Sequence, residues 1–233
     1  MSDSRLVLRD VTVRFGGNTA LDAVTLTADA PVTGIVGPNG AGKTTLLNVV
    51  AGFVRPQTGS VRLGTRELGD LAPHRRARAG VGRTFQHPVL VPMLTVAESL
   101  RLAARRGGDG MTVTDVVDLL GLGPWLDRDA HVLPYGVRKA VDIGRALVGG
   151  PRVLLCDEPL SGLDDAARDV TVQVLRTVAR RGVRLVVIEH DLARIAALAQ
   201  CLVVLDAGQV VTVGEPADVL ADERVRAAYT GTL

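Results

Sequence analysis

The sequence is poor in cysteine, in net charge and in long apolar runs. Its two cysteines, Cys156 and Cys201, lie far apart in apolar segments, which indicates buried free thiols rather than a disulfide or a metal-binding pair. A net charge of +2 is too small to argue for nucleic acid as a partner, and no apolar run approaches the roughly 18 residues of a membrane span. The N-terminal segment MSDSRLVLRD lacks the pattern of a signal peptide. We therefore expect a cytoplasmic protein that would need other chains to work at a membrane.

The length of 233 residues suits one domain, residues 1–233, with room for small subdomains. Charge is uneven along this length because basic residues cluster at 74–78, HRRAR. Such a cluster can be a solvated turn, or it can contact a phosphate or a partner.

Residues 33–52, TGIVGPNGAGKTTLLNVVAG, combine a short buried strand (34–36), a glycine-rich loop and the start of a helix. They match G-x-x-x-x-G-K-[ST], the motif of a phosphate-binding loop, at Gly37, Gly42, Lys43 and Thr44. Glycines let backbone N–H groups curl around a phosphate chain, and the helix adds its positive dipole end. The lysine can reach the β- and γ-phosphates, and the threonine hydroxyl can bind Mg²⁺. The alternative is a glycine-rich turn in front of a helix.

Two acidic residues follow a second apolar strand. The run 153–156 ends in Asp157 and Glu158, at the carboxyl end of a strand, where α/β proteins bind ligands. Asp157 could hold Mg²⁺ through water, and Glu158 could orient or deprotonate an attacking water. His190 follows the apolar run 185–188 and could reach the same pocket to contact a γ-phosphate. Acids at a strand end and a lone histidine are also common without a function, and Gln86 carries little information by itself.

Apolar patterns predict the remaining elements of an α/β fold. Antiparallel strands are expected over 6–15, 21–27 and 61–63. Thr95 and Glu98 form a capping box for a helix that should end at 105–108, in a strand-free patch from about 95 to 134 that also holds a helix over 112–120. Buried parallel strands are expected over 153–156 and 185–188, with a helix over 165–181 between them. A hairpin (202–205 with 210–213) and helices over 216–220 and 223–229 should close the chain.

A series of short motifs, taken in chain order, resembles the ATP-binding subunit of ABC transporters over essentially the whole chain. The series consists of the phosphate loop, Gln86, Leu133–Val137 followed by Arg145–Leu147, Asp157–Pro159, Ser161–Asp164 and His190. The resemblance implies a RecA-like P-loop ATPase core with an antiparallel β subdomain and a small α-helical subdomain, here about 94–145. It also implies head-to-tail dimers that hold two ATPs between the phosphate loop of one subunit and the signature of the other.

The same resemblance implies roles for single residues. Catalysis would fall to Glu158, His190 and Gln86, and Mg²⁺ would be held by Thr44, Gln86 and Asp157. Phe15 would stack on adenine, although a strand-end phenylalanine can also be an ordinary apolar residue. The other residues implied to bind ATP are Gly37, Asn39, Gly40, Ala41, Gly42, Lys43, Thr44 and Thr45 in the loop, and Pro134, Tyr135, Gly136 and Asp164 outside it.

Finer features resemble importers of branched-chain amino acids. They are Arg14–Gly17, Gly82–His87, Tyr135 in the signature and Ala228–Gly231. Lipopolysaccharide-export ATPases share the layout and a comparable stretch at 71–82, so export is an alternative. A non-transport ABC ATPase acting on DNA or ribosomes is disfavoured because the interval between the glutamine motif and the signature is too short for a coiled-coil insertion. A P-loop kinase or GTPase would lack the signature.

An importer of this kind implies further partners. Transmembrane permease subunits would contact the region Gln86–Pro92, whose apolar residues suit a covered surface, although a buried loop is the alternative. A second ATPase subunit and an external solute-binding protein would complete the assembly, with this chain peripheral on the inner face of the cell membrane.

The signature departs from the family pattern LSGGQ, because it reads LPYGV at Leu133–Val137. Pro134 supplies neither a hydroxyl nor an N–H. The loss of one charge-assisted hydrogen bond costs roughly 1.5–3 kcal/mol, about 10- to 100-fold in affinity or rate. Since each site is completed by the other subunit's signature, we hypothesise a heterodimer in which this chain's own site is competent and its partner's site is weakened. A homodimer would carry the defect twice.

Overall fold

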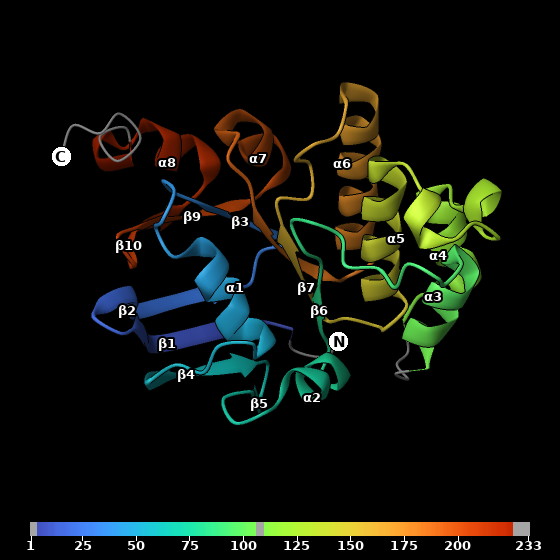
Figure 1. Cartoon of the computed structure of the whole chain (residues 1–233). Helices are drawn as coiled ribbons and strands as arrows, with labels where there is room; N and C mark the ends of the chain where they lie inside the picture. The colour runs from blue at the N-terminus through green and yellow to red at the C-terminus, as the bar shows by residue number, and fades with distance from the viewer. Residues whose placement is uncertain (1–3, 106–109, 226–233) are drawn as a thin grey trace.

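The computed structural model describes residues 4–105 and 110–225. Figure 1 shows two sheets with helices around them. Three predicted features lie wholly or partly outside the described residues: the helix end at 105–108, the helix at 223–229 and the segment 228–231. Within residues 4–105 and 110–225, no helix has the length and apolar character to cross a membrane.

The first sheet has four strands in the order β2-β1-β4-β5, and its three pairings are all antiparallel. The alternation of apolar residues explains why these strands form a sheet with one buried face: Leu6 and Leu8 point into the core and pair with Ala28 and Leu26 on the neighbouring strand. The predicted antiparallel strands are therefore confirmed. Their bounds are β1 (Leu6–Phe15), β2 (Asn18–Ala28), β4 (Thr58–Leu63) and β5 (Arg66–Glu67).

The second sheet has six strands in the order β10-β9-β3-β8-β7-β6. Its strands are parallel except for β10, which forms the predicted antiparallel hairpin with β9. Every residue of β3 and β7 is buried, as continuous apolar strands covered on both faces should be. The bounds are β3 (Val32–Val36), β6 (Val81–Arg83), β7 (Val153–Asp157), β8 (Arg184–Ile188), β9 (Cys201–Asp206) and β10 (Gln209–Gly214).

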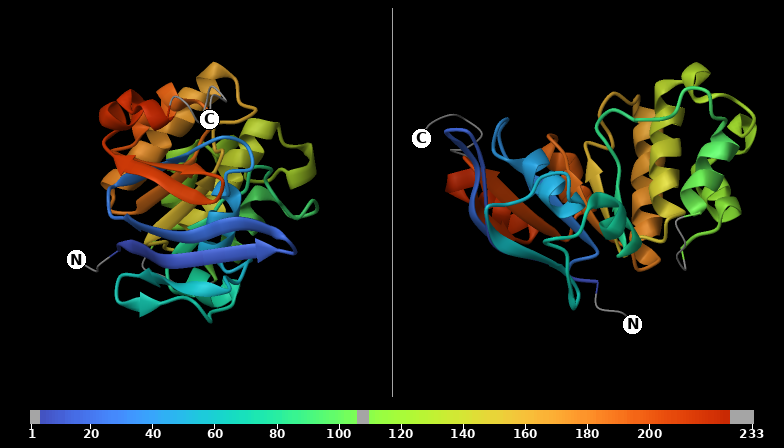
Figure 2. Two further views of the ribbon diagram at one scale, coloured as in Figure 1. Left: turned by 90° about the vertical axis from the view of Figure 1, so that its left-hand side faces the viewer. Right: turned by 60° about the horizontal axis from the view of Figure 1, so that its bottom comes forward.

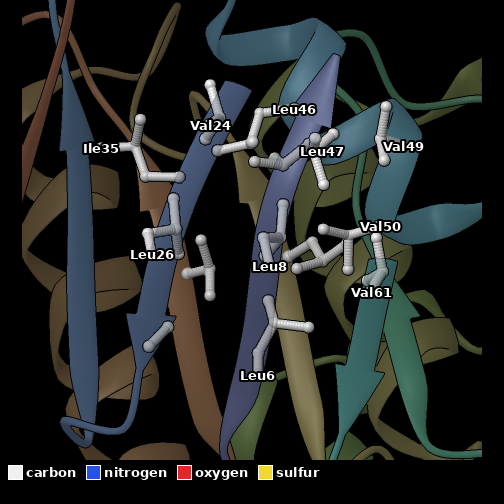
Figure 3. Packing of buried hydrophobic residues seen from close by; sticks show 14 of the residues in the cluster. Leu6, Leu8, Val24, Leu26, Ile35, Leu46, Leu47, Val49, Val50 and Val61 are labelled. Atoms are coloured by element: carbon white, nitrogen blue, oxygen red, sulfur yellow. The ribbon is translucent and has the colours of Figure 1, made fainter. Parts of the chain in front are cut away.

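One core lies between the two sheets, around helix α1 (Lys43–Ala51). Figure 3 shows side chains of β1, β2 and β4 meeting those of α1, with Leu8 opposite Leu47 and Val50. Alternate residues of the parallel strands, such as Leu155 and Ile188, complete this core. The phosphate loop in front of α1 is therefore fixed to both sheets.

The opposite face of the parallel sheet forms a second core, to which Leu154, Cys156 and Val187 contribute. Helices α6 (Asp165–Arg180), α7 (Leu192–Leu198) and α8 (Pro216–Ala221) cover it. Both cysteines are free, with Cys156 fully buried and Cys201 half-buried, so the prediction of a buried thiol holds fully only for Cys156.

The helical part lies at the end of the molecule away from β1 and β2 (Figure 2). Both Thr95 with Glu98 and Thr112 with Asp115 form capping boxes, which confirms the two predicted helix starts. Helix α5 packs against α3 and α4. The bounds are α3 (Val96–Ala104), α4 (Val113–Leu120), the 3₁₀ turns η1 (Gly123–Trp125) and η2 (Ala130–Val132), and α5 (Tyr135–Leu147).

The structure corrects the sequence prediction at two places. Residues 74–78 belong to a short helix, α2 (Pro73–Arg78), rather than to a turn, and although His74, Arg75 and Arg78 are exposed, Arg76 is 2% exposed and donates hydrogen bonds to four backbone carbonyl oxygens. Two of these carbonyls end helix α1, so Arg76 caps that helix from a distance. Helix α5 begins at Tyr135 rather than near Arg138, because Pro134 stands at its N-cap.

Candidate functional site

The phosphate loop joins the end of β3 to the first turn of α1, and two of its glycines are required by their surroundings. Gly37 has φ of 148° and Gly42 has φ of 100°, both in the region that favours glycine. A Cβ atom on Gly37 would lie 2.0 Å from the carbonyl oxygen of Leu205, and one on Gly42 would lie 2.5 Å from that of Ala20. The loop is therefore clamped between β2 and the end of β9, with its backbone shaped for an anion.

Lys43 lies folded against this loop. Its ammonium donates hydrogen bonds to the carbonyl oxygens of Gly37 at 2.7 Å and Pro38 at 2.8 Å. Burial lowers its pKa, while the charges of Glu158 and Asp157 oppose that shift. Asn39, Gly40 and Thr44 are exposed around it, and Ala41 is buried. A buried ammonium surrounded by exposed loop residues suits a phosphate chain that approaches from solvent.

Asp157 stands at the end of β7 beside two partners. Its Oδ2 lies 3.1 Å from Nη2 of Arg83, and the nearby Thr44 hydroxyl lowers the pKa of its carboxyl. Burial raises the pKa of Asp157, while the positive charge of Arg83 opposes that shift. A threonine hydroxyl next to a carboxylate is the oxygen donor set that Mg²⁺ prefers. Thr44 and Asp157 therefore fit a magnesium ion at the phosphate loop.

Glu158 is the point at which the three predicted catalytic residues meet. Its Oε2 accepts a hydrogen bond from the Gln86 amide at 2.8 Å, and its Oε1 lies 2.6 Å from Nε2 of His190. Its backbone has φ of +48°, a conformation that is uncommon for a residue with a side chain. These contacts orient one carboxylate at the end of the strand that also delivers Asp157, an arrangement suited to holding a water molecule.

A family model described as "ABC transporter" matches residues 21–161. The chain belongs to the ABC transporter family. The maltose/maltodextrin import ATP-binding protein MalK of Salmonella typhimurium is 37% identical to it, over 90% of this chain and 58% of MalK. The molybdenum import ATP-binding protein ModC of Mycobacterium tuberculosis is 40% identical, over 96% of this chain and 63% of ModC. The chain thus spans less than two thirds of the length of these relatives.

Solved structures agree with this membership. The structure of MJ1267, an ATP-binding cassette of an ABC transporter in its ADP conformation, matches with a TM-score of 0.88 at 29% identity and covers 98% of this chain and 99% of MJ1267. The dimeric structure of MJ0796, a bacterial ABC transporter cassette, has a TM-score of 0.80 at 25% identity and covers 91% and 98% of the two chains. The α/β cassette fold and the resemblance to ABC ATPases are therefore confirmed. These relatives are named for maltose and molybdenum, so the branched-chain subfamily stays a prediction.

The signature of this ABC cassette lies at the start of α5. Pro134 is exposed at the N-cap, and no side chain caps the helix there. The Tyr135 hydroxyl donates to the backbone oxygen of Gln86 at 3.2 Å, and Gly136 packs beside Leu163. The first turn of α5 is thus in contact with the glutamine motif of the same chain.

Three further residues implied to bind ATP lie outside the contacts described above. Asp164 caps helix α6, because its Oδ1 accepts a hydrogen bond from the Ala167 N–H at 2.8 Å. Phe15 is 53% exposed at the end of β1, which leaves a ring face open for stacking. Thr45, in the first turn of α1, is half-buried.

The cassette also contains buried charged residues near Glu158 that sequence reasoning missed. Lys139, Asp142, Glu189 and Arg83 are each nearly inaccessible to solvent, and all four lie within or next to the elements that carry the predicted motifs. The sequence could have indicated Lys139 and Asp142, because these charged residues stand among the apolar positions, Val141 and Ile143, that are buried in α5.

Proposed function

We propose that this cassette binds and hydrolyses Mg-ATP. The observation that carries the proposal is the Glu158 carboxylate, held by Gln86 and His190 and close enough for its charge to act on Lys43. Lys43 and the backbone N–H groups of the loop hold the phosphates. Mg²⁺, held by Thr44, Asp157 and Gln86, would neutralise charge on the β- and γ-phosphates. Glu158 orients the attacking water and accepts its proton, while His190 stays beside the γ-phosphate.

The hydrolysis is tested with this chain assembled with its partner ATPase subunit, because the other subunit's signature completes each ATP site in the proposed dimer. Wild type should release phosphate from Mg-ATP, and Glu158→Gln should lower kcat by about 10²- to 10⁴-fold while ATP binding persists. Exposed Glu223 provides the control, because Glu223→Gln should keep the wild-type rate. Equal rates for wild type and Glu158→Gln would refute the role of this carboxylate.

ATP hydrolysis by this chain would drive transport through separate permease subunits. A groove of about 530 Å³ supports this, lined by Phe53, Phe85 and Val89 among others. Beside it Val89, Val91 and Met93 are 67%, 51% and 76% exposed, so the loop that contains the predicted contact Gln86–Pro92 is not buried. Exposed apolar side chains around an apolar groove suit a protein partner. Val89→Asp should release the chain from membranes that contain the permease, with ATP binding unchanged.

We infer import rather than export, with branched-chain amino acids or similar molecules as cargo. MalK and ModC are named as import proteins, which supports the direction, and the stretches 14–17 and 82–87 support the subfamily. An external solute-binding protein would then deliver the cargo, and this chain would lie on the cytoplasmic face of the membrane. Uptake of labelled leucine that depends on this chain would support the subfamily, while uptake of maltose or molybdate instead would refute it.

The working assembly is a head-to-tail dimer of nucleotide-binding domains, each equivalent to residues 1–233 with a helical subdomain at about 94–145. The dimeric cassette MJ0796 supports dimerisation. Exposed Pro134 at the N-cap of α5 supports a heterodimer, because it offers no hydroxyl to the partner's ATP and the Tyr135 hydroxyl is bonded to Gln86 of this chain. Glu158→Gln with Mg-ATP should remain monomeric alone in size-exclusion chromatography. ATP-dependent dimers of this chain by itself would favour a homodimer.

A further inference from the structure

One polar face of helix α5 contacts the segments that follow strands β6 and β7, which carry Gln86 and Glu158. Tyr135, Lys139, Asp142 and Arg145 recur at helical spacing, and each bonds to backbone in another segment. Three of them hold the stretch that follows β6, through Gln86 O, Phe85 N and Val89 O. Lys139 differs, since its ammonium donates to the carbonyl oxygen of Glu158 at 2.6 Å.

Glu158 needs such an anchor because of its backbone. A φ of +48° is strained for glutamate. Its N–H donates to Ile188 at 3.0 Å, and its carbonyl oxygen accepts from Lys139 and, at a longer 3.2 Å, from the Ser161 N–H. If the backbone relaxed to a negative φ, Cβ would change direction and carry the carboxylate away from Gln86 and His190.

The surroundings of Lys139 make this bond a fixed one. Lys139 is 4% exposed and lies 5.6 Å from the centre of the Tyr135 ring. Glu189, itself buried, offers an opposite charge and binds the Leu160 N–H at 2.8 Å, in the same turn that follows Glu158. A buried ammonium has few other acceptors, so its charge-assisted bond to Glu158 is retained.

We infer that Lys139 is a positioning residue for ATP hydrolysis, which holds the backbone of Glu158 in its left-handed conformation and thereby aims the Glu158 carboxylate. The inference rests on the proposed hydrolysis. It also means that the orientation of Glu158 depends on helix α5, whose first turn is the signature. A shift of helix α5 would therefore change the orientation of the Glu158 carboxylate, which acts on the attacking water.

The test compares Lys139→Met, Lys139→Arg and wild type as full chains, each assembled with the partner ATPase subunit that completes its ATP site. Loss of a charge-assisted bond should lower kcat for Mg-ATP by about 10- to 100-fold in Lys139→Met. KM, and the affinity for a non-hydrolysable ATP analogue, should stay within about twofold, because the phosphate loop is untouched. Lys139→Arg should recover most of kcat. Arg176→Met is the matched control, since Arg176 of α6 also donates to a backbone oxygen, that of Ala197, but through an exposed hydrogen bond.

Amide hydrogen exchange supplies a readout that does not need turnover. The Ser161 amide should exchange faster in Lys139→Met than in wild type or Arg176→Met. Unchanged exchange, a kcat within about twofold of wild type, or a Lys139→Arg variant as slow as Lys139→Met would overturn the inference. A wild-type dimer that releases no phosphate from Mg-ATP would refute the proposed hydrolysis instead, and hydrogen exchange would still decide the role of Lys139. Should Lys139→Met not fold, Lys139→Met/Glu189→Gln removes the unpaired carboxylate and is judged by the same criteria.

Discussion

In the proposed dimer the phosphate loop and the first half of α5 would each bind ATP, the loop in this chain's own site and α5 in the partner's site, yet they are built in opposite ways. The loop is shaped by backbone, with glycines where a Cβ would strike the carbonyls of Leu205 and Ala20. Helix α5 acts through side chains such as Tyr135 and Lys139, which reach backbone far away in the sequence. A site made of backbone tolerates few residue types, whereas a site made of side chains can change its sequence and keep its contacts.

Substitution within the loop should have the largest effect. Gly37→Ala would bring Cβ to 2.0 Å from the Leu205 oxygen, a backbone atom that cannot move aside. We expect the free energy of unfolding, measured with urea, to fall by at least about 4 kcal/mol, with loss of ATP binding. Gly40→Ala is the matched control: its φ is +83°, but no atom lies within 4 Å, so only backbone strain of about 1–2 kcal/mol is expected. Equal losses would mean that conformation, not contact, fixes this loop.

Substitution of Arg76 tests whether a buried side chain contributes as much to the free energy of unfolding as the glycines of the phosphate loop. The Arg76 guanidinium satisfies four carbonyl oxygens, among them those of Val49 and Val50 at the end of α1. Arg76→Met should therefore reduce the free energy of unfolding by about 3 kcal/mol. Exposed Arg75, its neighbour, is the control, and Arg75→Met should change stability by less than about 0.5 kcal/mol. Similar values for the two variants would show that the buried bonds add nothing.

The difference between the two regions also explains what could be read from the sequence. The phosphate loop, the acids at the end of β7 and the capping box at Thr95 were predictable because their residues lie at fixed short spacing. The α/β class followed from apolar strands without polar residues. Helix α2, in contrast, depends on bonds from Arg76 to residues up to 27 positions away, which no local pattern reveals.

The same limit applied to the interior of the site. The contact of His190 with Glu158 could be expected, because parallel strands end at one edge. The hydrogen bond from Lys139 to the Glu158 carbonyl oxygen could not be predicted from the sequence, because the angle between α5 and the sheet is set by packing against α3 and α4.

The carboxyl of Asp142 should make a smaller, pH-dependent contribution. Burial raises its pKa to about 6, while an unfolded aspartate has a pKa of about 3.9. Between these values the folded chain binds more protons, so this group lowers the free energy of unfolding as pH rises from about 4 to 6. Asp142→Asn keeps an acceptor for the Phe85 N–H but does not ionise.

Urea unfolding at several pH values measures this effect. The stability of Asp142→Asn relative to wild type should increase by about 2 kcal/mol between pH 4 and pH 7.5. A constant difference across this range would show that Asp142 stays charged when buried, and that α5 tolerates an ionised carboxylate beside the groove.

Substitution of Pro134 should change the free energy of unfolding least. It also compares the two regions directly, because it tests whether the signature needs a side-chain hydroxyl or only its backbone. In Pro134→Ser, the hydroxyl can accept from the Gly136 or Val137 N–H and cap α5, and it still has a proton for a phosphate oxygen of the partner's ATP. Pro134→Ala is the matched control, because it frees the unfolded chain to the same degree but adds no hydroxyl. The serine variant should exceed the alanine variant by about 1 kcal/mol in unfolding free energy.

In the dimer the two variants should differ again, by about tenfold or more in turnover at the partner's site and not at this chain's own. The unequal effect follows because the signature acts across the interface, whereas Glu158 and the phosphate loop act within one chain. If serine and alanine gave the same turnover, the remaining backbone donors at the start of α5 would suffice. The signature would then resemble the phosphate loop after all, as a site whose chemistry depends on its backbone and not on its side chains.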